Sequence, residues 1–107
     1  MRRGEIRWYA FRTPDKRRPV LILTRDSAIG YLNAVTIAPI TTTIRDIPTE
    51  VRLTVEDGVT TDCVANLDNI QTVPKSQVGA LIGRLTVGKM YSVQRAITFA
   101  LGFDSAY

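Results

Sequence analysis

The sequence predicts a mainly β fold, a small barrel or curled sheet of short strands with one C-terminal helix packed on it. Short apolar runs separated by turn residues fill most of the chain up to residue 85. The run at residues 50–55 alternates strictly between apolar and polar side chains, as a strand with one buried face does. Apolar residues recur at helical spacing only after residue 86. Strands followed by a single helix indicate this fold class.

Two strands are expected near the N-terminus. Residues 4–11 alternate imperfectly, with Ile6, Trp8 and Ala10 on one face. Residues 19–23 carry four consecutive large apolar side chains, which is typical of a strand buried on both faces. Pro19 has no N–H to donate and fits the first position of that strand. Arg18 then lies directly before the strand, which holds it on a rigid support. A turn at residues 13–15 divides the polar, basic loop between the strands.

The middle of the chain supplies the other strands. A single helical turn at residues 26–30 has Asp26 as its N-cap and Gly30 as its stop. In the strand at residues 34–40, Pro39 marks an edge or a bulge. Asp57-Gly58 is a hairpin-type turn. The further predicted elements are strands at residues 63–66, 69–73 and 80–85 and a short helical start at residues 74–77.

The C-terminal helix is expected to begin after Thr86, its N-cap, and to end at Gly102. The apolar residues at positions 87, 90, 91, 97, 100 and 101 mark one face of it. This face is expected to meet the core or a second copy of the chain.

Composition limits the class of protein. With 107 residues, of which 45% are hydrophobic and 22% charged, the chain is expected to form one ordered domain spanning residues 1–107. No apolar run is long enough for a membrane helix, and no signal peptide is recognisable. The single cysteine, Cys63, suits a reducing cytoplasm and is expected to be a small buried hydrophobe.

The positive charge is concentrated at the N-terminus. Residues 1–18 hold seven basic and two acidic side chains, a net charge of +5, whereas the remaining chain has a net charge of −1. Such clustering favours an anionic partner, nucleic acid or an acidic protein segment. A solvated basic edge that only keeps the protein in solution is the alternative.

The chain contains no histidine. This excludes His–His acid/base pairs, Ser–His and Cys–His nucleophiles and most zinc sites. Catalysis would have to use Arg, Lys, Asp, Glu, Ser, Thr or Tyr. No metal or other cofactor is expected.

Several short motifs, in order, resemble those of the MazF/PemK-type toxins of bacterial toxin–antitoxin systems. They are Gly4-Glu5-Ile6, Arg18-Pro19 before an apolar strand, Ala38-Pro39-Ile40-Thr41-Thr42, Ile47-Pro48 followed by Glu50-Val51, Asp68-Asn69-Ile70-Gln71-Thr72-Val73 and Ile82-Gly83. The resemblance covers residues 3–101. It implies an SH3-like barrel, a homodimer, and sequence-specific, metal-independent cleavage of single-stranded RNA to a 2′,3′-cyclic phosphate and a 5′-hydroxyl. It also implies a cognate antitoxin whose disordered segment occupies the RNA groove.

The resemblance identifies Arg18, Thr41 and Asp68 as the catalytic candidates. Arg18 is the arginine of the Arg-Pro motif, and Thr41 is the first threonine after the Pro-hydrophobic pair. Asp68 matches an aspartate implicated in some members. The candidates for RNA binding are Arg17, Thr42, Arg45 and Gln71.

The sequence departs from the family pattern at three places. An arginine found in some members two positions before the aspartate is Asn66 here, and the common arginine of the Ile-Arg-Thr segment is Gln71. The first loop, residues 12–17, is shortened, so a loop glutamate proposed as catalytic in some relatives has no counterpart. The sequence preference and the identity of the proton acceptor therefore stay open.

The residue types suit the chemistry of the resemblance. A guanidinium stays protonated and can hold two phosphate oxygens, so Arg18 is assigned electrostatic stabilisation. The Thr41 hydroxyl can donate to a non-bridging oxygen or orient the 2′-hydroxyl. Asp68 is either a general base or, together with Asn69, a residue that only forms a turn. Trp8 and Tyr9 are either core residues or platforms on which bases stack.

Two functions from different classes follow. The first is an endoribonuclease toxin. The second is a toxin of the same fold that binds nucleic acid or protein without cleaving, such as a gyrase poison.

Overall fold

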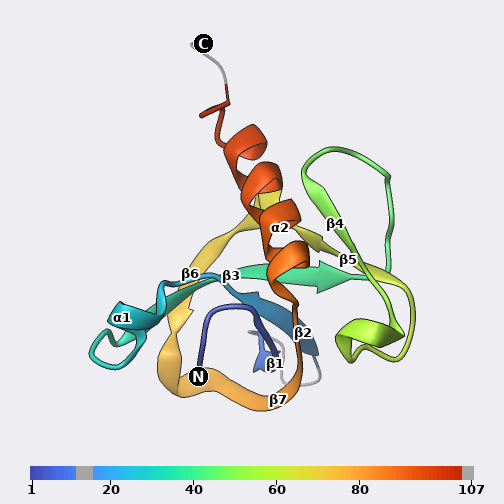
Figure 1. The fold of residues 1–107 in the computed structure, drawn as a ribbon. Coiled ribbons are helices and arrows are strands. Elements are labelled where there is room, and N and C mark those ends of the chain that lie inside the picture. The colour runs from blue at the N-terminus through green and yellow to red at the C-terminus, as the bar shows by residue number, and fades with distance from the viewer. Residues whose placement is uncertain (12–15, 105–107) are drawn as a thin grey trace.

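A curved antiparallel sheet with one long helix standing over it forms the fold (Figure 1). The computed structural model describes residues 1–11 and 16–104, so the predicted turn at residues 13–15 lies outside the described residues. The strands in these residues are β1 (Glu5–Ala10), β2 (Arg17–Ile22), β3 (Ala34–Thr41), β4 (Glu50–Leu53), β5 (Cys63–Asn66), β6 (Gln71–Pro74) and β7 (Val78–Arg84). The helices are α1 (Asp26–Ile29) and α2 (Val87–Ala100), with 3-10 turns η1 (Val55–Asp57), η2 (Leu67–Asn69) and η3 (Lys75–Gln77). The predicted mainly β fold with a C-terminal helix is confirmed.

Strand β3 joins the two parts of the sheet. The strand order is β4-β5-β3-β2-β1-β7, and β6 also pairs with β3. On one edge β3 pairs with β6 as far as Ile37 and with β5 from Ile40 onward. Pro39 lies between these two pairings, where its missing N–H interrupts neither ladder. The predicted edge was therefore wrong, because Pro39 pairs with Val20 of β2 inside the sheet, at the position where the other side of β3 changes partner.

Strand β2 is buried on both faces, as its run of apolar residues predicted. Leu21 packs into a core cluster with Ile6, whereas Val20 and Ile22 pack into a second cluster with Tyr9. Alternate side chains of a strand point to opposite faces, so one short strand supports both cores. The predicted start was wrong, because β2 begins at Arg17 and Pro19 is its third residue. Pro19 is tolerated there because pairing with β3 begins only at Val20.

The two ends of the strand order meet at a close backbone contact. The predicted strand at residues 50–55 ends at Leu53, and the chain turns through η1 into Gly58, whose φ is 100°. A Cβ atom added at Gly83 of β7 would lie 2.1 Å from the Asp57 carbonyl oxygen. A Cβ added at Gly58 would lie 2.9 Å from the Gly83 Cα atom. Glycine at both positions lets η1 touch β7 and closes the barrel.

Helix α2 begins as predicted, and its predicted apolar face is confirmed only in part, because Met90, Ile97 and Ala100 pack on the core whereas Val87, Tyr91 and Leu101 are exposed. The Thr86 hydroxyl oxygen accepts a hydrogen bond from the Lys89 N–H at 3.1 Å, which confirms the N-cap. The fully buried positions are Val93 and Ala96, whereas Val87 is 74% exposed. In α1, Arg25 is the N-cap and Asp26 is the first helical residue, which corrects the prediction for Asp26.

Candidate functional site

The register of β2 and β3 brings Arg18 and Thr41 to the same face of the sheet. The pairing ends at Val20 opposite Pro39. Arg18 and Thr41 each lie two residues beyond this last pair, and residues two apart in a strand share a face. By the same alternation, Arg17 and Thr42 belong to the opposite face. Arg17 and Arg18 therefore lie on opposite faces of the sheet, and so do Thr41 and Thr42.

These four candidates line one pocket, which we call the mouth pocket. It has a volume of about 440 Å³. Its lining residues are Trp8, Lys16, Arg17, Arg18, Pro19, Ile40, Thr41, Thr42, Val59, Thr60, Thr61, Cys63 and Ile82. No carboxylate occurs among these described residues, so the polar lining consists of cations and hydroxyl groups. Such a lining suits an anion.

Arg18 also borders a second pocket, which we call the Tyr9 pocket. This pocket has a volume of about 690 Å³ and includes Gln71 and Gln77. Gln71 pairs with Ile37 of β3, so it shares the face of Ile37 and therefore that of Thr41. The Tyr9 hydroxyl donates to Gln77 Oε1 at 3.1 Å, which makes Tyr9 a buried part of the wall rather than an open stacking platform. The structure thus brings Gln71 to the same side of the sheet as Arg18.

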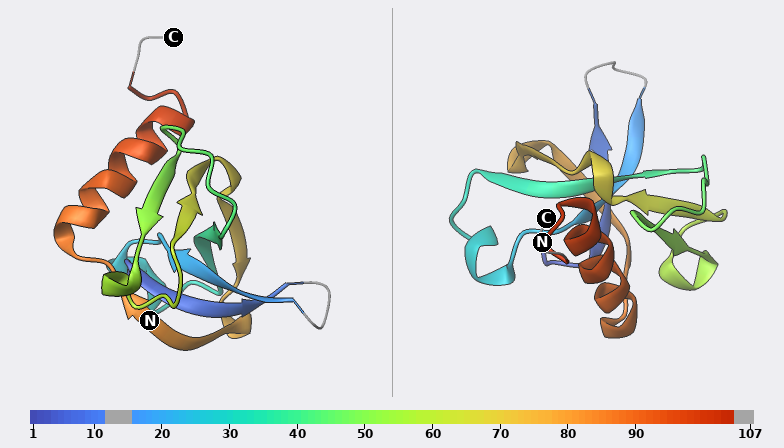
Figure 2. Two further views of the ribbon diagram at one scale, coloured as in Figure 1. Left: turned by 90° about the vertical axis from the view of Figure 1, so that its right-hand side faces the viewer. Right: turned by 90° about the horizontal axis from the view of Figure 1, so that it is seen from above.

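The strands β1 and β2 project from the body of the molecule on the side away from α2 (Figure 2). Strand β2 begins at Arg17, so Arg17 and Arg18 lie at the N-terminal end of β2, in this projecting part. Within residues 1–11 and 16–104, neither arginine makes an ion pair. The Arg17 guanidinium carbon lies over the Trp8 ring, 4.8 Å from its centroid.

Arg7, another basic residue of the N-terminal cluster, is already engaged by Glu5. The buried Glu5 carboxylate accepts hydrogen bonds from Arg7 Nε at 2.8 Å, from the Arg2 backbone N–H at 2.9 Å and from Arg84 Nη2 at 3.0 Å. Burial raises the pKa of Glu5, but the hydrogen bonds from Arg7, Arg2 and Arg84 outweigh it and lower the pKa to about 2. Glu5 therefore stays ionised and holds the Arg7 and Arg84 guanidinium groups. Arg17 and Arg18, by contrast, border the mouth pocket and make no ion pair within the described residues.

Asp68 and Asn66 lie on another part of the chain, at η2. The Thr49 hydroxyl donates to Asp68 Oδ2 at 2.6 Å, and the Asp68 N–H donates to Asn66 Oδ1 at 2.9 Å. Asp68 lines neither the mouth pocket nor the Tyr9 pocket, so a single protomer does not bring it to Arg18. Asn66, at the position where some family members have arginine, is the buried N-cap of η2. Its role here is structural.

Arg45 is also separate from both pockets. It lies in the loop between β3 and β4, and its backbone N–H donates to Glu50 Oε1 at 2.9 Å. Its side chain is exposed. An exposed arginine can contact a long ligand outside the mouth pocket, and its part in binding stays a prediction.

The structure adds lining residues that the sequence reasoning did not single out. Thr60 and Thr61, in the loop after η1, line the mouth pocket together with Thr41 and Thr42. The only sequence signal was their adjacency to the Asp57-Gly58 turn.

Cys63 is buried in the pocket wall, as predicted. Its burial, together with the negative charges of Asp57 and Asp62, raises the pKa of its thiol. The thiol therefore stays protonated and acts as wall, not as a nucleophile.

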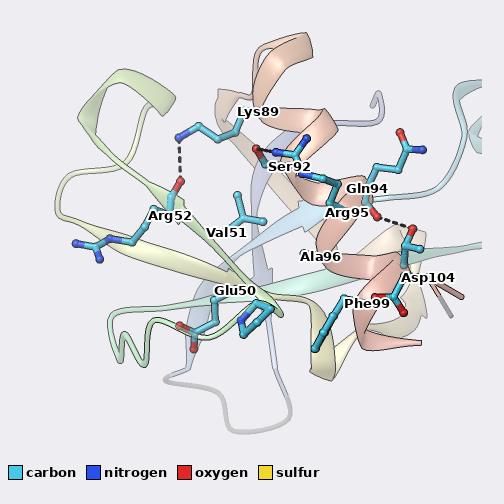
Figure 3. Close-up of a pocket in the computed structure, with 12 residues that line it drawn as sticks. Glu50, Val51, Arg52, Lys89, Ser92, Gln94, Arg95, Ala96, Phe99 and Asp104 are labelled. Carbon is cyan, nitrogen blue, oxygen red and sulfur yellow. Dashed lines mark hydrogen bonds between the residues drawn. The ribbon is translucent and has the colours of Figure 1, made fainter. Parts of the chain in front are cut away.

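A larger pocket lies between α2 and β4 (Figure 3), with a volume of about 860 Å³. It contains none of the site candidates. Side chains of both charges line it, the acidic Glu50 and Asp104 and the basic Arg52, Lys89 and Arg95. Lys89 Nζ is occupied, donating to the Arg52 carbonyl oxygen at 2.9 Å and lying 3.3 Å from Asp57 Oδ2. Size alone therefore does not identify the site, and the uniform positive charge favours the mouth pocket.

Two negative findings apply to the part of the chain that the structure describes. No helix there is long and apolar enough to cross a membrane. No cluster of three or more His, Cys, Asp or Glu side chains there is arranged to hold a metal ion.

Comparison with known proteins identifies the family. Residues 2–101 match the family model described as the PemK-like, MazF-like toxin of type II toxin–antitoxin systems. The probable endoribonuclease MazF2 of Mycobacterium tuberculosis is 40% identical over 103 residues, which cover 95% of this chain and 99% of the relative. Endoribonuclease MazF3 of the same species is 42% identical over 90 residues, which cover 84% and 87% of the two chains.

Solved structures agree with the sequence comparison. The M. tuberculosis toxin MazF-mt6 superposes with a TM-score of 0.85 at 39% identity, covering 96% of this chain and 99% of that one. A mycobacterial endoribonuclease in complex with its cognate antitoxin superposes with a TM-score of 0.86 at 30% identity, covering 95% of each chain. The resemblance predicted from the motifs and the small SH3-like barrel that it implied are confirmed. The chain belongs to the family of PemK-like, MazF-like toxins of type II toxin–antitoxin systems.

Proposed function

We propose that residues 1–107 form one toxin domain, an endoribonuclease that cuts single-stranded RNA at the mouth pocket. The observation that carries this proposal is the position of Arg18 and Thr41, which extend adjacent strands beyond their last pair, on one face, into a pocket without described carboxylates. The relatives named endoribonuclease support the reaction class.

The reaction assigned to this site needs no water. The 2′-hydroxyl oxygen attacks the adjacent phosphorus, the bond from phosphorus to the 5′-oxygen breaks, and a 2′,3′-cyclic phosphate remains. One proton leaves the 2′-oxygen, and one is delivered to the departing 5′-oxygen. Arg18 holds two phosphate oxygens and stabilises the negative charge that grows on them. The Thr41 hydroxyl donates to a non-bridging oxygen or orients the 2′-hydroxyl.

The remaining candidates are assigned to proton transfer and to RNA binding. Asp68 is the proposed proton acceptor, with an exposed carboxylate of which one oxygen already accepts a hydrogen bond from Thr49. Since Asp68 lines neither pocket of its own protomer, this role requires a homodimer in which a second copy supplies it. Mixing two inactive proteins, Arg18→Ala and Asp68→Asn, would then restore part of the activity. No recovery in a confirmed mixed dimer would remove Asp68 from the mechanism.

RNA binding outside the cut bond is assigned to Arg17, Thr42, Arg45 and Gln71. Gln71 borders the Tyr9 pocket beside Arg18, and Thr42 lines the mouth pocket beside Arg17. Gln71 offers both a donor and an acceptor, which suits the edge of a base. The RNA is therefore proposed to contact both faces of β2 at its N-terminal end, the end that carries Arg17 and Arg18, which we call the outer end of β2.

The proposed protein partners are an antitoxin and a second toxin copy. A mycobacterial relative forms a complex with its cognate antitoxin. An acidic, disordered antitoxin segment would neutralise Arg17 and Arg18 and would block the mouth pocket. Exposed apolar side chains of α2, such as Val87 and Tyr91, support a dimer contact. We assign the action to the cytoplasm, where Cys63 stays reduced.

Cleavage of RNA in EDTA, followed by mapping of the ends, tests the proposal. We expect cuts at a short sequence with 5′-hydroxyl termini, and loss of cutting in Arg18→Ala and Thr41→Ala, with circular dichroism unchanged. The matched controls are Arg95→Ala and Thr98→Ala on α2, which should cut as the unmodified protein does. Full activity in Arg18→Ala or Thr41→Ala would overturn the site, and intact RNA with the unmodified protein would overturn the reaction.

A further inference from the structure

The stack of Arg17 on Trp8 lies on the face of the sheet opposite to Arg18. Trp8 stands directly across from Pro19 in the β1–β2 pair, and Arg17 is two residues before Pro19. Trp8 and Arg17 are therefore diagonal neighbours on one face. Arg18 pairs with Tyr9 and faces the other way. The two adjacent arginines thus leave opposite faces of the strand, although both border the mouth pocket.

The contact with Trp8 restricts the Arg17 guanidinium. Its carbon lies 4.8 Å from the centroid of the half-buried Trp8 ring, within the range of a cation–π contact. A guanidinium carries its N–H groups in its own plane, so those at its edge can still donate while the group lies over a ring. The stack also restricts a side chain that would otherwise lose much rotamer freedom on binding a ligand. Arg17 is therefore held ready to donate to an anion.

The surroundings of the stack provide further donors. Thr42, Thr60 and Thr61 line the mouth pocket together with Trp8 and Arg17. Their hydroxyl groups can donate to phosphate oxygens. Arg17 also covers the face of Trp8 on which it lies, so that face is not available to an RNA base.

We propose that Arg17 and the threonines Thr42, Thr60 and Thr61 form a second phosphate subsite, and that Trp8 is the positioning residue of Arg17. The subsite binds a phosphate of the same RNA strand beside the one that Arg18 contacts. This inference rests on the proposed function, because it divides the bound strand between the two faces of the outer end of β2. It gives the two adjacent arginines separate roles: Arg17 binds a phosphate, and Arg18 stabilises the reacting phosphate.

A double-mutant cycle tests the inference. The probe is a single-stranded 2′-deoxy oligonucleotide, which lacks the attacking hydroxyl and cannot be cut by the proposed reaction. Its affinity is measured by fluorescence anisotropy over a range of salt concentrations. Arg17→Ala should weaken binding about tenfold, as the loss of a charge-assisted contact does, and reduce the salt slope by about 0.7. Trp8→Leu should weaken binding about threefold, and Trp8→Phe should keep most of the affinity.

The cycle separates positioning from direct contact. If Trp8 acts through Arg17, Trp8→Leu has no further effect in a protein that already carries Arg17→Ala. An equal loss in both backgrounds would mean that Trp8 touches the strand itself, and unchanged binding in Arg17→Ala would overturn the subsite. Arg95→Ala serves as the control for the loss of one positive charge.

A spectroscopic readout covers the case in which Trp8→Leu fails to fold. Trp8 is the only tryptophan of the chain, so intrinsic tryptophan fluorescence reports on the stack alone. The oligonucleotide should change the Trp8 emission of the unmodified protein, and Arg17→Ala should abolish most of that change. An equal change in Arg17→Ala would contradict the proposal. Binding that depends on Arg17 in a protein that does not cut RNA would retain the subsite and reject only the proposed function.

Discussion

Arg18 and Thr41 extend β2 and β3 two residues beyond Val20 and Pro39, the last pair that joins these strands. Their separation is therefore set by the register of two core strands and not by a loop. Val20 is fully buried, and Ile37 and Ala38 of β3 are fully buried behind the site. A catalytic pair on such rigid elements is held close to one geometry in the absence of RNA.

The Thr41 hydroxyl is expected to act on the transition state rather than on RNA binding. Thr41→Val keeps the shape and removes the donor, so kcat should fall about a hundredfold while KM changes little. Thr41→Ser retains the hydroxyl and should retain most of kcat. Thr36→Val, five residues earlier in β3 and outside both pockets, is the control and should leave kcat unchanged. A loss in KM alone would reassign Thr41 to binding.

The backbone contact between η1 and β7 predicts a sharp difference between two glycines. Gly83→Ala would set a methyl group against the Asp57 carbonyl oxygen, so η1 and β7 must move apart, and the free energy of unfolding should fall by about 2–3 kcal/mol. At Gly30 a Cβ meets no atom within 4 Å and φ is −66°, so Gly30→Ala should change stability by less than about 0.5 kcal/mol. Urea denaturation measures both. Equal stability of the two variants would mean that the barrel does not close at this contact.

Glu5 predicts how stability depends on pH. Its pKa is about 2 in the folded protein against 4.5 for an unperturbed glutamate. Above pH 4.5 Glu5 is ionised in both states, and its stabilisation is complete. As the pH falls toward 2, the unfolded state takes up the proton first and the free energy of unfolding decreases. With Arg7 and Arg84 partly exposed, the loss should be about 2 kcal/mol.

The comparison with Glu5→Gln isolates this contribution. The variant should be less stable at pH 7, because Arg7 and Arg84 lose their carboxylate. It should lose about 2 kcal/mol less than the unmodified protein between pH 5 and pH 2.5, since the other carboxylates titrate alike in both. Parallel curves in urea denaturation would show that Glu5 is not the group responsible.

Elements with a local signal were predictable from the sequence. The run of apolar residues predicted that β2 is buried on both faces, and the strand at residues 63–66 has the predicted bounds. Thr86 was recognised as an N-cap because that role depends only on neighbouring residues. Arg18 and Thr41 were identified as candidates because family motifs mark them at the ends of two predicted strands.

Relationships between distant residues were not predictable. The ion pair of Glu5 with Arg84, the contact of Gly58 with Gly83 and the stack of Arg17 on Trp8 depend on which strands pair and in which register. Alternation in a sequence assigns residues to faces but does not choose the partner strand. The separation of Asp68 from the mouth pocket is hidden for the same reason.

Helix α2 shows a different limit, because the largest apolar residues do not mark its buried face. Helix α2 packs on η2 and β4 through Val93 and Ala96, whereas Val87 and Tyr91 of the predicted face are exposed. Met90, Ile97 and Ala100 pack at the margin of the core. Close packing of a helix on neighbouring elements favours small side chains at the contact, so size is a poor guide to the buried face.

The same substitution at two positions of α2 tests this assignment. Val93 is 1% exposed, and Val93→Ala should lower the free energy of unfolding by about 2 kcal/mol, because it removes two buried methyl groups and leaves a cavity. Val87 is 74% exposed, and Val87→Ala should leave stability unchanged or raise it by a few tenths of a kcal/mol, since alanine has the higher helix propensity. Urea denaturation at low protein concentration compares the two without a contribution from association. A larger loss in Val87→Ala than in Val93→Ala would show that Val87, and not Val93, packs against the core.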